Sequence, residues 1–344
     1  MIETLLKSLE KWAFKYIKKF FIFHFNINND ISDLNEIFSF KYNFIYIFIA
    51  FLIGFILTLP PVFFEIYFDV FTDFQLLTFL SFSALMIFFV LLEFYFLYLL
   101  GFYLFSKWGM QLYHYFNLNN ILSQKDFIKS VIRIIMELPE PRVEHKHNLN
   151  PYEHSSSKIL ILSLIYKIKV FASNFIAKVI LKKILIRSSF RGYVSLIAAP
   201  ITGFWDAFVF YRVMSITKYK IFERIFLLKI LSQNNKLIYS VEFQKIIRLR
   251  YYLFGEYNVN LDYILSKTFS EKFLYSKKEV KRIDYLNNDI NLKFLSILFA
   301  FKYQIFNHKE IEIIKKFALS ENIKYIKQLI KKSDLEGIYS FLIS

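Results

Sequence analysis

The sequence contains no cysteine and is poor in glycine and proline, with seven Gly and six Pro among 344 residues. The absence of cysteine excludes disulfide bonds, thiolate zinc sites and cysteine nucleophiles. Average proteins contain about 7 % Gly and 5 % Pro, so this chain has few residues for the many turns of all-β folds. We therefore predict an all-α protein that combines a membrane helical hairpin, a cytoplasmic helical region and a small helical bundle.

The usual catalytic motifs are also missing. The sequence contains no GxxxxGKS/T, GxGxxG, HExxH or GxSxG motif, and no glycine cluster that could form a phosphate-binding loop. These absences argue against nucleotide hydrolases, kinases, dinucleotide-binding enzymes, zinc peptidases and serine hydrolases. We expect a protein that is not an enzyme and that holds no cofactor.

Two long apolar runs dominate the first third of the chain, and 56 % of all residues are hydrophobic. Residues 42–64 carry no charge, and residues 74–106 carry only Glu93. A helix of 23 residues reaches roughly 34 Å, and a hydrocarbon core is about 30 Å thick. The sequence therefore predicts two membrane-spanning helices.

Glu93 has two interpretations. Carboxylates inside membrane helices often bind protons or ions, so Glu93 could belong to an ion pathway. If the span covers residues 74–92, however, Glu93 lies at the cytoplasmic interface and needs no such role. The length argument favours the interfacial position.

The loop between the two runs is acidic. It contains Glu65, Asp69 and Asp73 and no cation, whereas Lys41 precedes the first run and Lys107 follows the second. Cytoplasmic loops are enriched in Lys and Arg. We therefore predict a multi-pass protein of the cytoplasmic (inner) membrane with both termini in the cytoplasm and the acidic loop outside.

The residues before the first run form an amphipathic stretch. Between residues 5 and 23 the apolar side chains lie largely away from a lysine stripe made of Lys7, Lys11, Lys15 and Lys18. This pattern is typical of a helix in the membrane interface. Packing on the cytoplasmic part of the protein explains it equally well.

Composition divides the chain into five regions. They are an amphipathic segment (1–41), a two-span hairpin with a cytoplasmic extension (42–137), a polar linker (138–157), a basic membrane-apposed helical region (158–250) and a C-terminal helical domain (251–344). The linker contains three of the six prolines and also His145, His147 and His154. Histidine can bind divalent metals, but a segment without rigid elements lacks the support that such sites need, so we expect no native metal site.

Most of the net charge of +16 lies in the basic region. Residues 158–250 contain 17 cations and three acids, and each cation near an anionic leaflet contributes about 1 kcal/mol to binding. We therefore expect contacts with membrane lipids through their anionic headgroups, with candidates Lys178, Lys182, Lys183, Arg187 and Arg191. Nucleic acid is the rival ligand, but only six of the 17 cations are Arg and no DNA-binding motif is present. The positive-inside rule explains the same charge without any specific ligand.

A third apolar stretch covers residues 193–211 and contains Pro200, Gly203 and Asp206. Cations flank both of its ends, which disfavours translocation. We expect a helical hairpin held against the cytoplasmic leaflet or buried in the domain, with a third span as the alternative. Asp206 is expected to pair with a nearby Arg, because an unpaired buried carboxylate is costly.

Beyond residue 250, apolar residues recur at helical spacing in the segments 258–269, 290–305, 308–319, 322–332 and 335–343. Asn307, with Glu310 three residues later, resembles a helix-starting capping box. Short helices with polar breaks predict a small bundle.

One segment of the chain resembles a known family. Residues 199–213, APITGFWDAFVFYRV, are similar to a Pro-x-x-x-x-Trp-Asn-x-x-x-x-x-Arg-Val segment of an uncharacterised bacterial membrane-protein family, in which it precedes a helical domain like the tellurite-resistance TerB fold. Residues 295–310 resemble the TerB helix–turn–helix, so the resemblance covers about residues 190–344. Glu310 matches the Glu that follows the turn there, but an Asp-Gly pair is replaced by Lys302-Tyr303 or Phe306-Asn307. The resemblance implies a C-terminal TerB-like fold and no established activity.

Together these features predict a membrane-anchored scaffold or interaction module with a basic cytoplasmic surface. Its partners would be lipids and either a second protein or further copies of the chain. The alternative is a transport or ion-coupled membrane component that uses Glu93 and Asp206.

Overall fold

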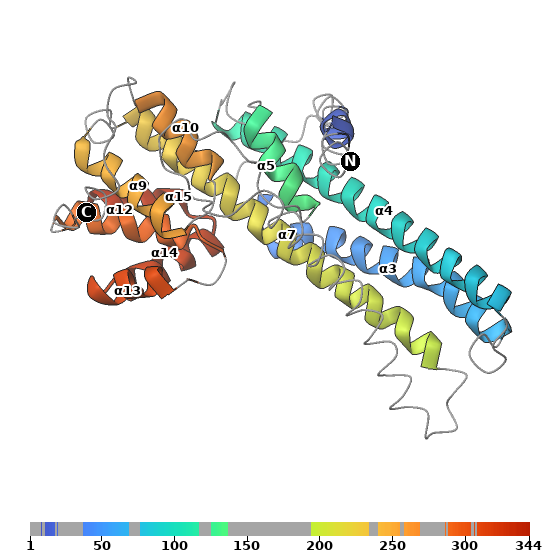
Figure 1. Cartoon of the computed structure of the whole chain (residues 1–344). Helices are drawn as coiled ribbons and strands as arrows, with labels where there is room; N and C mark the ends of the chain where they lie inside the picture. Colours follow the sequence, from blue (N-terminus) through green and yellow to red (C-terminus); the bar gives the residue numbers. More distant parts are fainter. Residues whose placement is uncertain are drawn as a thin grey trace. The chain divides into compact units, whose positions relative to one another are not determined.

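The computed structural model describes residues 8, 11–17, 19, 37–68, 76–116, 125–136, 194–233, 240–254, 258–268, 286, 288–303, 306 and 308–344. Within these residues every regular element except a single 3₁₀ position at Leu286 is an α-helix and there is no strand (Figure 1), which confirms the all-α prediction. The chain divides into two compact units. Unit 1 comprises Met1–Asn29, Ser39–Met110 and Ser156–Met214, and unit 2 comprises Asp30–Phe38, Gln111–Ser155 and Ser215–Ser344.

Unit 1 contains the two long apolar helices. Helix α3 covers Phe40–Phe68 and helix α4 begins at Leu76 and ends at Phe116, beyond the limit of the unit. Each is long and apolar enough to cross a membrane, over Lys41–Phe64 and Leu80–Gly109 respectively. Lys41–Phe64 agrees with the predicted run of residues 42–64. Leu80–Gly109 overlaps the predicted run of residues 74–106, but it begins and ends later than the span of residues 74–92 that would place Glu93 at the interface.

Helix α7, Val194–Gln233, belongs to unit 1 up to Met214 and to unit 2 from Ser215. It continues without a break through Pro200 and Gly203, so the hairpin expected for residues 193–211 is wrong. Proline is tolerated inside a helix where neighbouring groups satisfy the freed carbonyl. Gly203 serves close packing rather than a turn, since a Cβ there would lie 2.7 Å from the carbonyl oxygen of Phe51.

Proline does not end the first apolar helix either. Pro60 and Pro61 stand near the end of the predicted run, where a helix can stop without losing interior hydrogen bonds, but α3 continues past both to Phe68. Pro61 and Val62 are buried.

Unit 2 is a bundle of shorter helices. They are the remainder of α7 with α5 (Lys125–Ile135), α9 (Val241–Phe254), α10 (Val259–Thr268), α12 (Asp289–Ala300), α13 (His308–Lys316), α14 (Ser320–Lys331) and α15 (Leu335–Ile343). The five helices predicted beyond residue 250 are all present, although α12 ends five residues before its predicted limit. The core of the unit is aromatic: Phe243 and Phe294 stack at 3.9 Å between ring centroids, and Phe226 lies 5.6 Å from Phe301.

Helices α13 and α14 are both followed by left-handed residues that are not glycine. Ala318 has φ 51° and Ser333 has φ 61°. After α14, the Asp334 N–H bonds to the Leu329 carbonyl and the Ser333 N–H to the Ile330 carbonyl, which is a Schellman motif. The same pair of bonds follows α13, so both helices end in a tight turn without glycine, and the second turn leads into α15, which packs on α14.

Candidate functional sites

The exposed apolar side chains of the described residues gather on α3, α4 and the first half of α7. The largest exposed fractions include Tyr67 at 83 %, Leu77 at 78 % and Phe204 at 68 %. The candidate spans are only 28 % and 17 % buried, whereas a core helix of a soluble protein would be mostly covered. Exposed large hydrophobic residues in the described part of unit 2 are scattered singly: Val241, Tyr303, Ile311, Tyr325 and Ile343. A concentration of large exposed apolar side chains on a few helices is typical of contact with lipid or with another protein.

Cations and aromatic rings mark one end of α3 and α4. The Lys107 ammonium donates to the Tyr46 hydroxyl at 2.9 Å and lies 4.6 Å from the centroid of the Tyr42 ring. The Trp108 indole donates to the Asn43 side-chain oxygen at 3.2 Å. Tyr, Trp and Lys at the end of an apolar helix are typical of a membrane–water interface.

The amphipathic N-terminal stretch is helical over residues 11–17 and contacts α4. The Trp12 ring lies 5.7 Å from Tyr95 and 6.0 Å from Phe102, and the Ser106 hydroxyl donates to the Ile17 carbonyl at 3.2 Å. Residues 11–17 therefore pack on α4 within unit 1, and a position of this segment in a membrane interface stays a prediction. Lys11, Lys15 and Lys19 are exposed on it, whereas Lys7 and Lys18 lie outside the described residues.

Glu93 and Asp206, the candidate intramembrane or buried carboxylates, are both buried. Glu93 is 8 % exposed within the candidate span of α4, and Asp206 is 5 % exposed in the first half of α7. Asp206 packs on α3 at Gly54: a Cβ at residue 54 would lie 1.9 Å from its Oδ2 atom. Gly54 thus provides the space in which the carboxylate sits, and the Thr58 hydroxyl donates to the Gly54 carbonyl at 2.6 Å. Such small-residue crossings allow close helix packing in membranes.

The predicted lipid contacts cannot be compared with the structure. Lys178, Lys182, Lys183, Arg187 and Arg191 lie outside the described residues, as do the linker and its three histidines. In the described part of the chain, no group of three or more His, Asp or Glu side chains could hold a metal ion. The pairing expected between Asp206 and an Arg stays a prediction.

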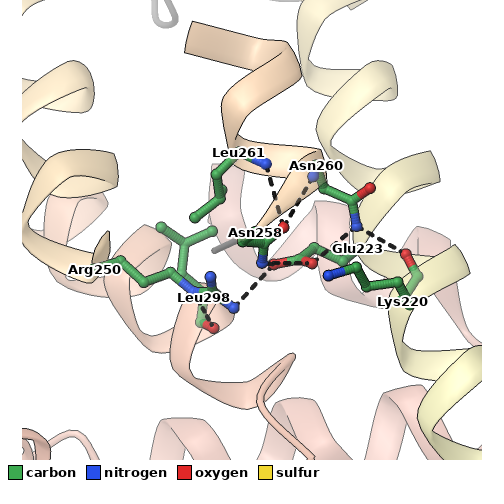
Figure 2. Close-up of polar contacts among 7 residues, drawn as sticks. All are labelled: Lys220, Glu223, Arg250, Asn258, Asn260, Leu261 and Leu298. Carbon is green, nitrogen blue, oxygen red and sulfur yellow. Dashed lines mark hydrogen bonds and ion pairs between the residues drawn. The ribbon is translucent and has the colours of Figure 1, made fainter. Parts of the chain in front are cut away.

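A buried polar network joins α7, α9 and α10 in unit 2 (Figure 2). Glu223 is 2 % exposed, and its Oε1 atom lies 3.0 Å from the Arg250 guanidinium. The Asn258 amide donates to both carboxylate oxygens at 2.9 and 3.0 Å, and the Asn260 amide donates to Oε2 at 2.9 Å. Arg250 also donates through Nε to the Leu298 carbonyl at 3.2 Å.

Asn258 has two roles in this network. Its side-chain oxygen accepts from the backbone N–H of Asn260 at 2.9 Å and of Leu261 at 3.4 Å, which caps the start of α10. Its amide meanwhile holds Glu223. Because donors already engage both oxygens of the Glu223 carboxylate, we assign the network a structural role rather than an acid–base or metal-binding role.

The neighbouring Arg224 lies between aromatic rings. Its guanidinium carbon is 3.7 Å from the centroid of Tyr263 on α10 and 5.7 Å from that of Phe127 on α5, and the residue is 1 % exposed. These distances fit cation–π contacts, which strengthen on desolvation. Glu223 and Arg224 were not predicted as functional or buried charges from the sequence, although adjacent opposite charges inside the apolar stretch 221–228 were an available signal.

Glu310, which the TerB resemblance highlighted, is fully buried, and the Lys302 ammonium lies 2.9 Å from each of its oxygens. An internal cation thus neutralises this carboxylate, so it forms an ion pair within the domain. Asn307, the expected N-cap, lies outside the described residues, but α13 begins at the next residue, His308. No family model, curated protein or solved structure matches this chain.

Proposed function

We propose that this chain is an integral membrane protein in which α3 and α4 anchor a helical cytoplasmic unit that acts as a scaffold or interaction module. The observation that carries the proposal is the exposed apolar surface of α3 and α4. Burying such a surface in lipid removes large side chains such as Ile45, Phe88 and Leu91 from water, and each full burial is worth about 1.5–3 kcal/mol. A soluble monomer would leave these side chains in water.

The charge distribution supports an orientation with both ends of the hairpin in the cytoplasm. The ammonium of Lys107 at the end of the second span lies close to Tyr42 at the start of the first, so cations gather at one end. The exposed Lys11 and Lys15 belong to a segment that packs near that end, on Phe102 and Ser106. By the positive-inside rule this end faces the cytoplasm.

A scaffold role fits the chemistry of unit 2. The buried carboxylates of Glu223 and Glu310 are engaged by Arg250 and Lys302, and the sequence lacks nucleotide-binding and hydrolase motifs. The proposed partners are membrane lipids with anionic headgroups and either a second protein or another copy of the chain. Lys178, Lys182, Lys183, Arg187 and Arg191 supply the proposed headgroup contacts.

Thiol labelling tests the anchor and its orientation, and the absence of native cysteine makes the experiment clean. A single cysteine replaces Thr72 in the acidic loop or Ser123 after the second span. We expect an impermeant maleimide added to whole cells to label Thr72→Cys but not Ser123→Cys, and to label both after permeabilisation. Reversed labelling would overturn the orientation, and recovery of the chain in the soluble fraction would overturn the anchor.

One observation favours a second function, an ion-coupled membrane component. Glu93 and Asp206 are both buried in helices whose exposed faces are apolar, and such carboxylates often serve ion or proton pathways. In this case Glu93→Gln abolishes proton or cation flux in reconstituted vesicles while the protein remains folded. If Glu93 has only an interfacial role, no flux depends on it and stability changes by less than about 1 kcal/mol.

A further inference from the structure

Four lysines from three parts of unit 2 meet at one corner of the bundle, at the ends of α12 and α14. We call Lys218, Lys302, Lys327 and Lys331 the lysine corner. The Lys218 ammonium donates to the Lys331 carbonyl at 3.1 Å, and the ring of the next residue, Tyr219, lies 5.4 Å from Tyr303, the residue after Lys302. These two contacts bring α7 to α14 and to the end of α12.

Phe306 lies between α14 and α12 at the lysine corner. The Lys327 ammonium lies 4.9 Å from the centroid of the Phe306 ring, which itself packs 5.9 Å from Phe299 of α12. Lys331 follows Lys327 by one helical turn, and like charges at this spacing repel each other. The half-buried Lys327 side chain thus points toward the residues that follow α12.

Positive charge at the lysine corner exceeds negative charge. The Glu310 carboxylate contacts this corner through Lys302, whose ammonium lies 2.9 Å from each of its oxygens. Burial lowers the pKa of Lys327, and the charges of Lys331 and Lys302 lower it further. Burial also lowers the pKa of Lys218 to about 8. The Lys327 ammonium is therefore held near two other cations at an energetic cost that a bound anion would reduce, whereas the shift at Lys218 comes from burial alone.

We propose that the lysine corner is a binding site for a phosphate group, carried either by a lipid headgroup or by a soluble phosphate compound. Ammonium groups bind phosphate oxygens as point charges and suit a multiply charged anion. The negative end of the α14 dipole does not oppose this ligand strongly, because the Lys218 ammonium already caps the Lys331 carbonyl. Lys327 and Lys331 then provide the charges that bind the phosphate, because the Lys302 ammonium is paired with Glu310 and the Lys218 ammonium lies over the rings of Phe38 and Phe222.

The test uses the full-length chain in nanodiscs of zwitterionic lipid, titrated with inorganic pyrophosphate by isothermal calorimetry. We expect saturable binding that Lys327→Gln and Lys331→Gln each weaken about fivefold, since one cation contributes about 1 kcal/mol near an anionic surface. Lys315→Gln on α13 removes the same charge from an exposed position outside the corner and should leave the affinity unchanged. Equal weakening by Lys315→Gln would show non-specific attraction and overturn the site.

A second arm identifies the source of the phosphate. Nanodiscs containing phosphatidic acid replace the zwitterionic discs, and the pKa of Lys327 is followed by NMR of methylated lysines. A rise in this pKa in phosphatidic acid discs, lost in Lys331→Gln and retained in Lys315→Gln, assigns the site to a lipid headgroup. A rise with pyrophosphate alone assigns it to a soluble phosphate. No rise and no calorimetric binding in either arm refutes the proposal, and thermal unfolding of each variant verifies that it is folded.

Discussion

Replacing Glu223 should destabilise unit 2 more than any surface change. In Glu223→Gln, one carboxylate oxygen becomes an NH₂ group in a site whose neighbours are the donors Arg250, Asn258 and Asn260. Breaking a buried ion pair by removing one partner costs about 3–5 kcal/mol. For a unit of this size, 1 kcal/mol shifts the melting temperature by about 2–4 °C, so we expect a decrease of roughly 6–20 °C.

Circular dichroism of the purified full-length chain in detergent measures this decrease. The matched control is Glu336→Gln on α15, the same substitution in an ion pair with Lys229, but at a carboxylate that is 80 % exposed. Exposed pairs contribute about 0–1 kcal/mol, so the control should melt within about 4 °C of the original protein. Glu223→Gln melting in that same narrow range would refute the assigned structural role of the network.

A double variant separates the ion pair from the packing around it. Glu223→Leu combined with Arg250→Met removes both charges and keeps most of the volume, and such exchanges of buried pairs are often neutral or stabilising. The amides of Asn258 and Asn260 still lack their carboxylate acceptor in the double variant. We therefore expect it to recover only the part of the Glu223→Leu loss that comes from the unpaired Arg250 charge. Equal loss in the single and double variants would mean that the introduced leucine disturbs packing and that the charges contribute little.

Three further predictions concern other parts of the fold. Gly54→Ala places a Cβ on the Asp206 carboxylate and should separate α3 from α7. The melting temperature should fall, and a cysteine introduced at Thr58 should become more reactive. An unchanged melting temperature and thiol reactivity would show that the contact between α3 and α7 adapts at no cost. Ala318→Gly should stabilise the protein by about 1 kcal/mol, because exposed Ala318 has φ 51° and glycine adopts this conformation without strain. Ala300→Gly, at the buried last residue of helix α12, should destabilise it in the same melting assay. Burial lowers the pKa of Lys218 from its usual 10.5 to about 8. Between these pH values the unfolded chain binds more protons at this group than the folded protein does. Lys218 should therefore make the free energy of unfolding rise with pH from 8 to 10.5. The melting temperature of Lys218→Met should lack that part of the rise, and parallel pH profiles for the two proteins would contradict the assignment.

The helices of the C-terminal region could be predicted from the sequence because apolar spacing and packing agree there. Ile323, Ile326 and Ile330 repeat at helical spacing and are all buried in α14. The long apolar runs predicted α3 and the candidate span of α4 for a related reason, since length and hydropathy alone identify such helices.

The errors arose where a residue has a tertiary role that overrides its local preference. Pro200 and Gly203 usually interrupt helices, but Gly203 permits close contact with Phe51, and the helix continues. The Glu223 network was missed because its partners Asn258 and Asn260 come 35 and 37 residues later in the chain. A local pattern cannot indicate which distant side chain will meet a buried charge.

The double role of Asn258 has a consequence for local opening of the chain. A helix of ten residues such as α10 would normally fray at its first turn, where the first N–H groups lack helical acceptors. Here Asn258, which caps this turn, also donates to the Glu223 carboxylate. The turn therefore cannot open unless this carboxylate, which pairs with Arg250, loses one of its hydrogen-bond donors. The amide protons of Asn260 and Leu261 should therefore exchange with solvent only in the larger cooperative openings that expose the core of the bundle, not by fraying of α10.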